Sequence, residues 1–564
     1  MTTKRKRGLT PFRLAAVALL AIPSAAPAMT VIRVGGPSAP DERKVAIVGS
    51  SQRLAGERFE VVDEAGATVL DGDLKRAPGK PAPFAHAYRA DLSAVTAPGD
   101  YRVAVGRKRS RPWTVAAGGI HPAIRAILGF FDTNRDGAEQ SQTHGASHLN
   151  DAIVHPDAAA HGGEAIDITG GWMDAGDMLH FTQTTAFAAA LLQASARLDP
   201  ADAPALESEA DVGVRWLLKA HPFADAFVAQ VGDERDHDRG FRDPALDDAS
   251  SKPGIGARFA YTLPPEKIGG DLGGKTAAAL AMAYQRSGSA AQLAAARAWY
   301  DAGTLSGRPA PALKRAGYPA YAGNFYASGK WEDSMATGAL ELYRATSEQR
   351  YLDDYGAYIT ARESRATGTI AVVDSFSGLA AADACGALGR PPIPAGAALE
   401  HSCGLLAENG AIAIKQARSN AFGMPGFFTW GTTAQNGGSG ALAALSTAAP
   451  AGSGKGCEVA AGARDYMLGR NPFGAGLVVG YGANAAQHPH HWASVDGPGL
   501  PVGAVVGGPA PLDQIEGQGF RARGPLQSGF AAYADERRDY VTSEPALDYA
   551  AASILLLAAL DARC

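Results

Sequence analysis

The sequence predicts a mainly α-helical protein in which a small β-sandwich precedes a helical barrel or toroid. Short runs of alternating apolar and polar residues occupy residues 31–116, and long alanine- and leucine-rich stretches with helical spacing begin near His121. Strand signals are sparse beyond that point. A chain of 564 residues is long enough for two or more domains, each with its own core.

The net charge of −5 narrows the set of partners. It provides no general attraction to nucleic acid or to an anionic membrane surface, so we expect neither as a partner. The 68 glycines and 35 prolines, together with many alanines, predict closely packed helices joined by long irregular loops.

Residues 1–28 have the features of a signal peptide. Residues 4–7 are basic, residues 14–22 are apolar, and residues 26–28 read Ala-Pro-Ala, a typical cleavage site. The apolar run is short for a membrane span, and an uncleaved anchor is the alternative. We therefore expect a mature chain that starts near Met29, is secreted or periplasmic, and has no membrane contact after cleavage.

Residues 29–117 are predicted to form the β-sandwich, because turn signals such as residues 64–66 and 71–73 separate its strand-like runs. These runs are residues 31–34, 44–48, 59–62 and 101–105. We find no group of residues in this segment that would carry chemistry.

Residues 118–564 are predicted to form the helical barrel, and the loops at one of its ends would carry the chemistry. Apolar residues recur at helical spacing over residues 181–198, 206–220, 275–286, 290–300, 332–346, 404–417, 440–449, 458–468 and 546–562.

The four cysteines, Cys385, Cys403, Cys457 and Cys564, all belong to the predicted barrel. Export would permit disulfides, and Cys385 could pair with Cys403 across a loop, but spacing alone does not establish a pairing. No Cys-x-x-Cys motif occurs, which argues against a cysteine-rich zinc site.

The octet GGWMDAGD at residues 170–177 is the first candidate for a reactive site. Gly176 allows the backbone to fold back, so that Asp174 and Asp177 could point to one place. Two adjacent carboxylates can hold one water molecule, and one of them can take its proton. The alternative is a helix N-cap with turn acids, directly before the helix expected from residue 181.

Glu544 is the second candidate. Ser543 resembles an N-cap and Pro545 suits a first helical turn, which would put Glu544 at a helix N-terminus. That position favours the ionised carboxylate, whereas a general acid needs a raised pKa. Only burial, with Tyr533 and Tyr540 as neighbours, could raise it. An ordinary helix-start glutamate is the alternative.

Two further loops contain histidines. His488, His490 and His491 lie within four residues and invite a metal interpretation, but no metalloprotease-type helix accompanies them, so a polar loop that bonds a ligand is favoured. Residues 233–237 (DERDH) are a charged run of the kind usually found in solvated loops, in which His237 is the best candidate to meet a ligand.

In this order, the stretches resemble glycoside hydrolase family 9, which includes many cellulases. The octet matches the family's GG-W/Y-x-DAGD stretch, and residues 233–237 resemble its GDG-x-x-DH loop. Further matching positions are Leu468, Gly469, Asn471 and Pro472, then Gly482, Asn484, Pro489 and His490, and finally Tyr533, Asp535, Tyr540, Glu544 and Ala546. The resemblance covers nearly the whole mature chain and implies an (α/α)6 barrel after an immunoglobulin-like β-sandwich.

The resemblance also implies hydrolysis with inversion. Asp177 would be the general base, Asp174 would help to position the water, and Glu544 would be the general acid, roughly 6.5–9.5 Å from the base. Asp535 and His490 would complete the catalytic site. The substrate would meet His237 through a sugar hydroxyl, together with Tyr540 and Trp430. A tryptophan can stack on a sugar face, although a buried core tryptophan is the alternative for Trp430.

Several positions depart from the family pattern. Trp492 stands where an arginine would clamp sugar hydroxyls, a loss for which Arg521 or Arg523 could compensate. Ala550, Pro545 and Lys275 replace the usual asparagine, small aliphatic residue and glutamate. The family often carries structural calcium, for which Ser328, Glu332 and Asp333 could supply oxygen ligands, but a helix cap explains them equally well. We assign no metal and expect no required cofactor.

The leading hypothesis is therefore an exported enzyme that cleaves β-1,4-glucan, either cellulose or cellodextrins. One alternative is an exo-acting β-glucosidase or β-glucosaminidase on short oligosaccharides. Another is a carbohydrate-binding protein that has lost catalysis. In each case the partner is a β-linked oligo- or polysaccharide, and the oligomeric state stays open.

Overall fold

The computed structural model describes residues 29–564, except residues 55, 140, 327, 362–374, 483 and 496. The predicted signal peptide therefore lies outside the described residues. Within them, every helix is either too short or too polar to cross a membrane.

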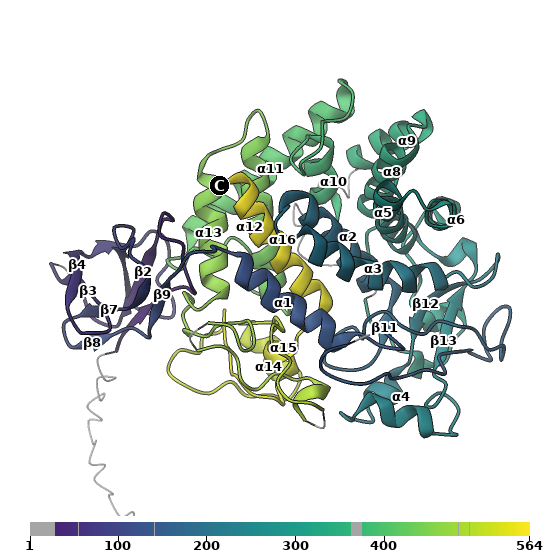
Figure 1. The fold of residues 1–564 in the computed structure, drawn as a ribbon, viewed down its shortest axis with the longest axis horizontal. Helices are drawn as coiled ribbons and strands as arrows, with labels where there is room; N and C mark the ends of the chain where they lie inside the picture. Colours follow the sequence, from purple (N-terminus) through teal and green to yellow (C-terminus); the bar gives the residue numbers. More distant parts are fainter. Residues whose placement is uncertain are drawn as a thin grey trace, which may run out of the picture.

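The N-terminal part of the described chain is a sandwich of two antiparallel sheets (Figure 1). One sheet has the order β1-β2-β6-β5, and the other has the order β4-β3-β7-β8 with β9 also paired to β7. The strands are β1 (Thr30–Arg33), β2 (Val45–Ser50), β3 (Arg58–Val62), β4 (Thr68–Asp73), β5 (Lys75–Arg76), β6 (His86–Asp91), β7 (Gly99–Val105), β8 (Lys108–Arg109) and β9 (Trp113–Val115). Alternate residues such as Val48, Phe59 and Val103 face inward and form one buried core, as the period-two pattern predicted.

The rest of the chain is a double ring of helices, which confirms the predicted fold class. Each inner helix packs against the next, and the last inner helix packs against the first, so the ring closes. The inner helices are α2 (Thr182–Leu198), α5 (Gly270–Ser287), α8 (Glu332–Thr346), α10 (Ser377–Ala384), α12 (Thr432–Leu445) and α16 (Leu547–Arg563). The outer helices are α1 (His121–Asn134), α3 (Ala203–Lys219), α6 (Ala290–Ser306), α9 (Gln349–Thr360), α11 (Ala397–Ser419) and α13 (Lys455–Met467).

The richness in glycine and alanine has a packing reason in the inner ring. A Cβ atom on Gly274 of α5 would lie 2.3 Å from the carbonyl carbon of Ser334 in α8, and one on Gly338 would lie 2.8 Å from the carbonyl oxygen of Gly274. Small residues therefore allow the backbones of α5 and α8 to approach closely. Because inner helices are covered on all sides, α2 and α12 are buried along almost their whole length.

A small sheet within the helical part was not predicted. It has the order β10-β13-β12-β11 and consists of β10 (Ile153–Val154), β11 (His180–Phe181), β12 (Phe227–Val231) and β13 (Phe259–Leu263). Its strands are short and buried, so they lack the alternating pattern that marks a half-exposed strand. Antiparallel pairing of His180 with Val231 brings the segment after the GGWMDAGD octet beside the segment before residues 233–237.

The sandwich and the barrel share a polar junction. Arg33 of β1 donates from Nε to the carbonyl of Pro472 over 3.1 Å, and Arg43 pairs with Glu458 at 2.9 Å. The Leu-Gly-Arg-Asn-Pro stretch lies here, where Asn471 donates to the carbonyls of Tyr466 and Ala475. This stretch therefore supports the junction and contributes no side chain to the chemistry described below.

Two disulfides fasten the helical part. Cys385 is joined to Cys403, a pairing the sequence left open, and Cys457 of α13 is joined to Cys564. The second disulfide holds the C-terminal end of the inner helix α16 against the outer helix α13.

Candidate active site

The GGWMDAGD octet forms a tight turn that presents its acids and does not cap a helix. Helix α2 begins after Phe181, whose side chain makes no cap, while the Asp177 Oδ1 atom accepts the backbone N–H of Leu179 over 3.0 Å. Gly176 is required by close contact, since a Cβ atom there would lie 2.1 Å from the carbonyl oxygen of His490. The N-cap alternative for these acids is therefore wrong.

Asp177 is held in its ionised form by His237. The pairing of β11 with β12 places the short helix α4 (Glu234–His237) so that His237 Nδ1 donates to Asp177 Oδ2 over 2.6 Å. Burial would raise the pKa of Asp177, but the hydrogen bond and positive charge of His237 outweigh it and the pKa is lowered. The same hydrogen bond raises the pKa of His237 to about 9. Below that pH the two groups form an ion pair.

Glu544 has the opposite shift. Burial, reinforced by the negative charge of Asp177, raises the pKa of Glu544 to about 8. Its Oε1 atom accepts the backbone N–H of Gly176 over 3.3 Å, so the carboxyl group lies against the GGWMDAGD turn. At neutral pH Glu544 is therefore mainly protonated, which is the state that a general acid requires.

The predicted helix start at Ser543 is wrong. Glu544 lies between the short helix α15 (Tyr540–Ser543) and α16, which begins only at Leu547 with Ala546 as its N-cap. Ser543 Oγ instead donates to the carbonyl of Ala534. Glu544 thus does not experience a helix N-terminus that would favour ionisation, and burial decides its pKa.

Asp174 is buried beside these groups. Its Oδ2 atom accepts a hydrogen bond from the hydroxyl of Tyr326. Its Oδ1 atom has no hydrogen-bond partner within 3.5 Å among the described residues, although the Thr184 side chain is near enough to lower the pKa of Asp174. Burial raises the pKa of Asp174 to about 7, with the charge of Asp177 acting in the same direction. Sequence reasoning did not identify Tyr326, which follows no motif and reaches Asp174 only through the fold.

The three histidines of the loop at 488–491 have separate partners. His490 donates from Nδ1 to the carbonyl of Arg537 over 2.7 Å, and its backbone N–H donates to the carbonyl of Ser543. His491 is fully buried and donates from Nε2 to Asn134 Oδ1 over 2.9 Å. Asn134 in turn donates to the carbonyls of Met173 and Ala175, so His491 supports the turn from behind.

Asp535 positions this loop. Its two carboxylate oxygens accept the backbone N–H groups of Gln487 and His488, each over 2.9 Å, and His488 Nδ1 lies 3.3 Å from Oδ2. The carboxylate therefore fixes the chain just before His490. Among the described residues, these histidines form no group of ligand atoms that could converge on a metal ion.

An aromatic group lies beside His490. The ring of Tyr540 is 5.6 Å from those of His490 and Trp430 and 4.8 Å from that of Phe520. Trp430 is 38% exposed, so the buried-core alternative for this tryptophan is wrong. The hydroxyl of Tyr540 donates to Gln518 Oε1 over 2.8 Å.

Comparison with known proteins adds to this geometry. The model named "Glycosyl hydrolase family 9" matches residues 121–557. The chain belongs to glycosyl hydrolase family 9. The model named "Cellulase N-terminal ig-like domain" matches residues 38–110, within the sandwich. The predicted family and the predicted enzyme class, a glycoside hydrolase, are thus confirmed.

Individual relatives are similar over most of their length. Endoglucanase 14 from Arabidopsis thaliana is 30% identical over 491 residues, which cover 78% of this chain and 92% of that protein. Endoglucanase 13 from the same plant is 27% identical over 75% of this chain and 90% of its own length. Among solved structures, a metagenome-derived glycoside hydrolase family 9 endoglucanase aligns with a TM-score of 0.78 at 23% identity, covering 95% of this chain and 99% of the other. That last likeness shows the shared fold.

Trp492 departs from the family pattern in a way that the structure clarifies. Its side chain is 0% exposed and packs with Met173, Met178 and Ala493 beneath the turn. Trp492 therefore does not contact solvent. Although it occupies the motif position of the family's arginine, its side chain does not take the arginine's place above the sugar. Arg521 and Arg523 are exposed on the loop that carries Phe520.

Of the other departures, Pro545 directly follows Glu544, and the remaining two are buried in inner helices. Ala550 is fully buried in α16. Lys275 is fully buried in α5 and donates to Ser334 Oγ over 2.9 Å. Of the calcium candidates, Asp333 accepts the backbone N–H of Phe376 over 2.6 Å, and Ser328 Oγ donates to the carbonyl of Lys330.

A buried ionic cluster beneath the turn was also missed by sequence reasoning. Arg258, directly before β13, lies 3.0 Å from Asp136 and 2.5 Å from Asp151, and it donates to the carbonyl of Met178. His180 lies 2.8 Å from Asp136. The cluster fixes the backbone on the C-terminal side of Asp177, as Asn134 does on the N-terminal side.

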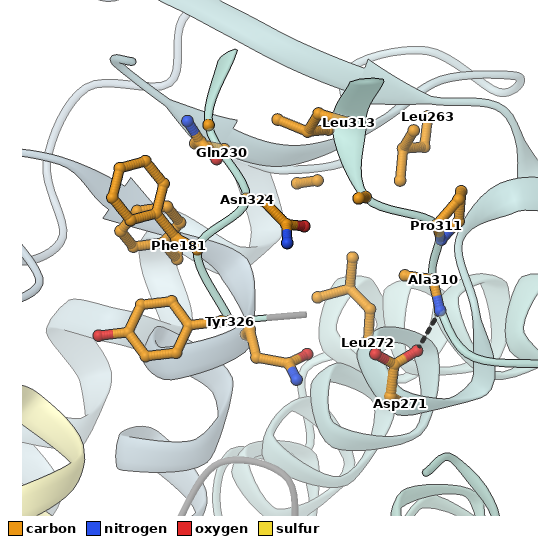
Figure 2. A pocket seen from close by; sticks show the side chains of 15 residues that line it. Phe181, Gln230, Leu263, Asp271, Leu272, Ala310, Pro311, Leu313, Asn324 and Tyr326 are labelled. Carbon is orange, nitrogen blue, oxygen red and sulfur yellow. Dashed lines mark hydrogen bonds between the residues drawn. The ribbon is translucent and has the colours of Figure 1, made fainter. Parts of the chain in front are cut away.

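Tyr326 is positioned by its aromatic neighbours. Its ring lies 5.0 Å from that of Phe181 in an edge-on contact. Both residues line a small cavity of about 70 Å³, into which Asn324 points (Figure 2). Asp271, at the far side of this cavity in Figure 2, accepts the backbone N–H of Ala310 over 2.7 Å.

Proposed function

We propose that this family 9 enzyme hydrolyses β-1,4-glucan with inversion, with Asp177 as general base and Glu544 as general acid. The observation that supports this assignment most directly is the pair of opposite pKa shifts in one site. His237 keeps Asp177 ionised, whereas burial keeps Glu544 protonated up to a pH of about 8. Inverting hydrolysis needs one carboxylate and one carboxylic acid at the same pH.

In the proposed reaction, the Asp177 carboxylate removes a proton from a water molecule as that oxygen attacks the anomeric carbon. The bond between that carbon and the leaving oxygen breaks, and Glu544 gives its proton to the leaving oxygen. Afterwards Asp177 is protonated and Glu544 is ionised, and proton exchange with solvent restores both. No step requires a cofactor.

Asp174 would orient the attacking water. Its Oδ2 atom is engaged by Tyr326, which leaves Oδ1 as the atom able to bond that water. The raised pKa of Asp174, about 7, limits the repulsion that a second full negative charge would exert on Asp177. Asp535 would act by fixing the loop that carries His490.

The substrate would lie along the aromatic group. Trp430 and Tyr540 offer ring faces suited to the apolar C–H faces of pyranose rings. His237 would hydrogen-bond one sugar hydroxyl. The Nδ1 atom of His490 is hydrogen-bonded to the carbonyl of Arg537, so its Nε2 atom would be available for a second sugar hydroxyl. The named relatives are endoglucanases, which favours internal cleavage of cellulose or cellodextrins over release of single sugars.

The absence of the family's arginine supports the exo-acting alternative, since Trp492 is buried and does not replace it. A non-catalytic role is disfavoured because the three carboxylates keep an environment suited to acid–base chemistry. We further propose that the mature enzyme is exported, in line with the features of residues 1–28.

Two substitutions and a substrate panel test the proposal. Asp177→Asn and Glu544→Gln should each lower kcat by about 10²–10⁴-fold or more, because each removes one member of the acid–base pair. Asp225→Asn, at an exposed carboxylate that pairs with His161 and not with the site, is the matched control and should retain activity. Near-normal activity of either variant would disprove the assignment.

The panel comprises cellohexaose, chito-oligosaccharides and carboxymethyl cellulose, with products followed by proton NMR. Initial products of inverted anomeric configuration and a rapid drop in viscosity would support endo-acting, inverting hydrolysis of glucan. Steady release of monosaccharide would favour the exo-acting alternative, and retention of configuration would refute the mechanism.

A further inference from the structure

A cluster of acids and one histidine lies where the helical ring closes, away from the catalytic acids. His121 is the first residue of α1, Asp199 follows the last residue of α2, and Asp561 belongs to the last turn of α16. These helices lie side by side in Figure 1. One ligand atom from each of the three side chains lies within 4.8 Å of the others, the only such group among the described residues.

We propose that His121, Asp199 and Asp561 bind a divalent transition-metal cation, of which zinc is the best match, that joins the first and last helices of the barrel. The first support is the state of Asp199. Its side chain is 1% exposed, its Oδ1 atom accepts the backbone N–H groups of Ala201 and Asp202, and its Oδ2 atom has no hydrogen-bond partner. That buried oxygen lies 3.5 Å from His121 Nδ1 and is directed into the cluster.

The second support is the spacing of the ligand atoms. Asp202 Oδ2 lies 2.9 Å from the same Nδ1 atom, so the imidazole nitrogen has a carboxylate oxygen of both Asp199 and Asp202 within 3.5 Å. Oxygen and nitrogen ligands about 2.0–2.2 Å from a tetrahedral zinc ion are separated from one another by roughly 3.4 Å. Asp202 would thus provide a fourth ligand once a cation replaces the proton on Nδ1.

The third support is the charge of the cluster. Three carboxylates face one imidazole, and the only other charged group that bonds to them among the described residues is Arg125, whose Nε donates to Asp202 Oδ1 over 2.8 Å. A divalent cation would relieve the repulsion between these acids.

The chemistry of the ligand set selects the cation. An imidazole nitrogen together with carboxylates suits zinc and similar transition metals. Calcium binds through oxygen ligands and would gain nothing from His121. Because the imidazole must lose its proton to bind, zinc affinity should fall at acidic pH.

A route for the cation is present. Asp561 lines a cavity of about 720 Å³ between the sandwich and the barrel, together with Gly119 and Ile120 just before His121. Asp561 itself is exposed, so a cation can enter from solvent. Bound there, it would fasten the segment that leaves the sandwich to the end of α16, near the Cys457–Cys564 disulfide.

The test uses the whole purified chain after treatment with EDTA and dialysis. Calorimetric titration with ZnCl2, with metal content measured by mass spectrometry, should show a single high-affinity ion per chain and a melting temperature that rises with zinc concentration. His121→Gln and Asp561→Asn should each weaken zinc binding by at least about tenfold, since loss of mere outer-shell partners costs about 10- to 100-fold.

Asp561→Asn changes an exposed side chain, so its result stands even if His121→Gln folds poorly. The matched control is Asp225→Asn, because His161 also contacts two acids but through opposite ring nitrogens, Nδ1 to Glu164 and Nε2 to Asp225. This control should bind zinc like the unmodified chain. Absence of zinc binding, zinc binding unaffected by Asp561→Asn, or tighter binding of CaCl2 than of ZnCl2 would each overturn the proposal.

Discussion

Replacement of His237 by glutamine should move the pH dependence of catalysis. In the structure, His237 Nδ1 lies 2.6 Å from Asp177 Oδ2, and this contact both raises the pKa of the histidine and lowers that of the aspartate. A base with a lowered pKa stays ionised in mildly acidic solution. Without the imidazolium, burial is no longer opposed, so the pKa of Asp177 should rise and the base should be protonated at a higher pH.

The size of the effect follows from the contact. The pKa of His237 rises from 6.5 to about 9, which would correspond to about 3.4 kcal/mol if it were wholly the pair interaction. The ring is 39% exposed, and Glu544 and Asp238 contribute to the rise, so solvent screening leaves about 1 kcal/mol for the pair. That energy corresponds to about one pH unit for Asp177.

The assay is kcat/KM against pH on a soluble cellodextrin. In His237→Gln the acidic limb of the profile should lie about one pH unit higher than in the unmodified enzyme. Loss of a substrate contact can also lower the maximum of kcat/KM, but that would not change the position of the limb. The alkaline limb should also move upward, because His237 lowers the pKa of Glu544. His161→Gln is the control, since that histidine also contacts two acids but lies outside the site. An acidic limb that does not move in His237→Gln would refute the proposed ion pair.

Three further outcomes are expected. Tyr326→Phe removes the hydroxyl that donates to Asp174. It should lower kcat by about 10- to 100-fold with little change in KM, because a hydrogen bond to a charged group contributes a free energy of that size. An unchanged kcat would show that the contact is dispensable. Gly176→Ala should destabilise the fold by about 1–3 kcal/mol and abolish activity, because its Cβ would lie 2.1 Å from the His490 carbonyl. Gly145→Ala is the control, because open space surrounds Gly145, and it should change neither stability in urea unfolding nor activity. Replacing Cys457 and Cys564 by alanine opens a 107-residue loop and should lower the free energy of unfolding by up to about 4.7 kcal/mol. Replacing Cys385 and Cys403 opens an 18-residue loop and should lower it by roughly 3 kcal/mol. If denaturant titrations showed that the first replacement costs no more than the second, the loop-entropy argument would be contradicted.

Local patterns predicted much of the fold. The helix expected over residues 332–346 coincides with α8, and that expected over 546–562 differs from α16 by one residue at each end. Long stretches with a strong apolar period leave few alternatives. The helix expected over 440–449 is in fact α12, Thr432–Leu445, because glycines and polar residues occupy a helix that is buried on all sides and so has no apolar stripe.

The candidate acids were predictable, but their states were not. The motifs identified Asp174, Asp177 and Glu544 as acids, and their assigned roles stay predictions until the substitutions are made. Local sequence suggested that Glu544 begins a helix and is ionised, whereas burial next to Asp177 raises its pKa to about 8. Tyr326 could not have been found, because nothing near it in the sequence marks it as a partner of Asp174.

The GGWMDAGD octet illustrates what local sequence can and cannot determine. The sequence by itself determined that two acids stand three residues apart, since covalent spacing is a local property. The need for glycine at position 176 comes from its close contact with the His490 carbonyl, which the fold creates. Only the tertiary structure decided which acid is ionised. The pairing of β11 with β12 brings His237 to Asp177, and the ring of helices buries Glu544 and Asp174. A pKa depends on charges and solvent within a few ångströms in space, and those neighbours come from segments that are distant in the chain.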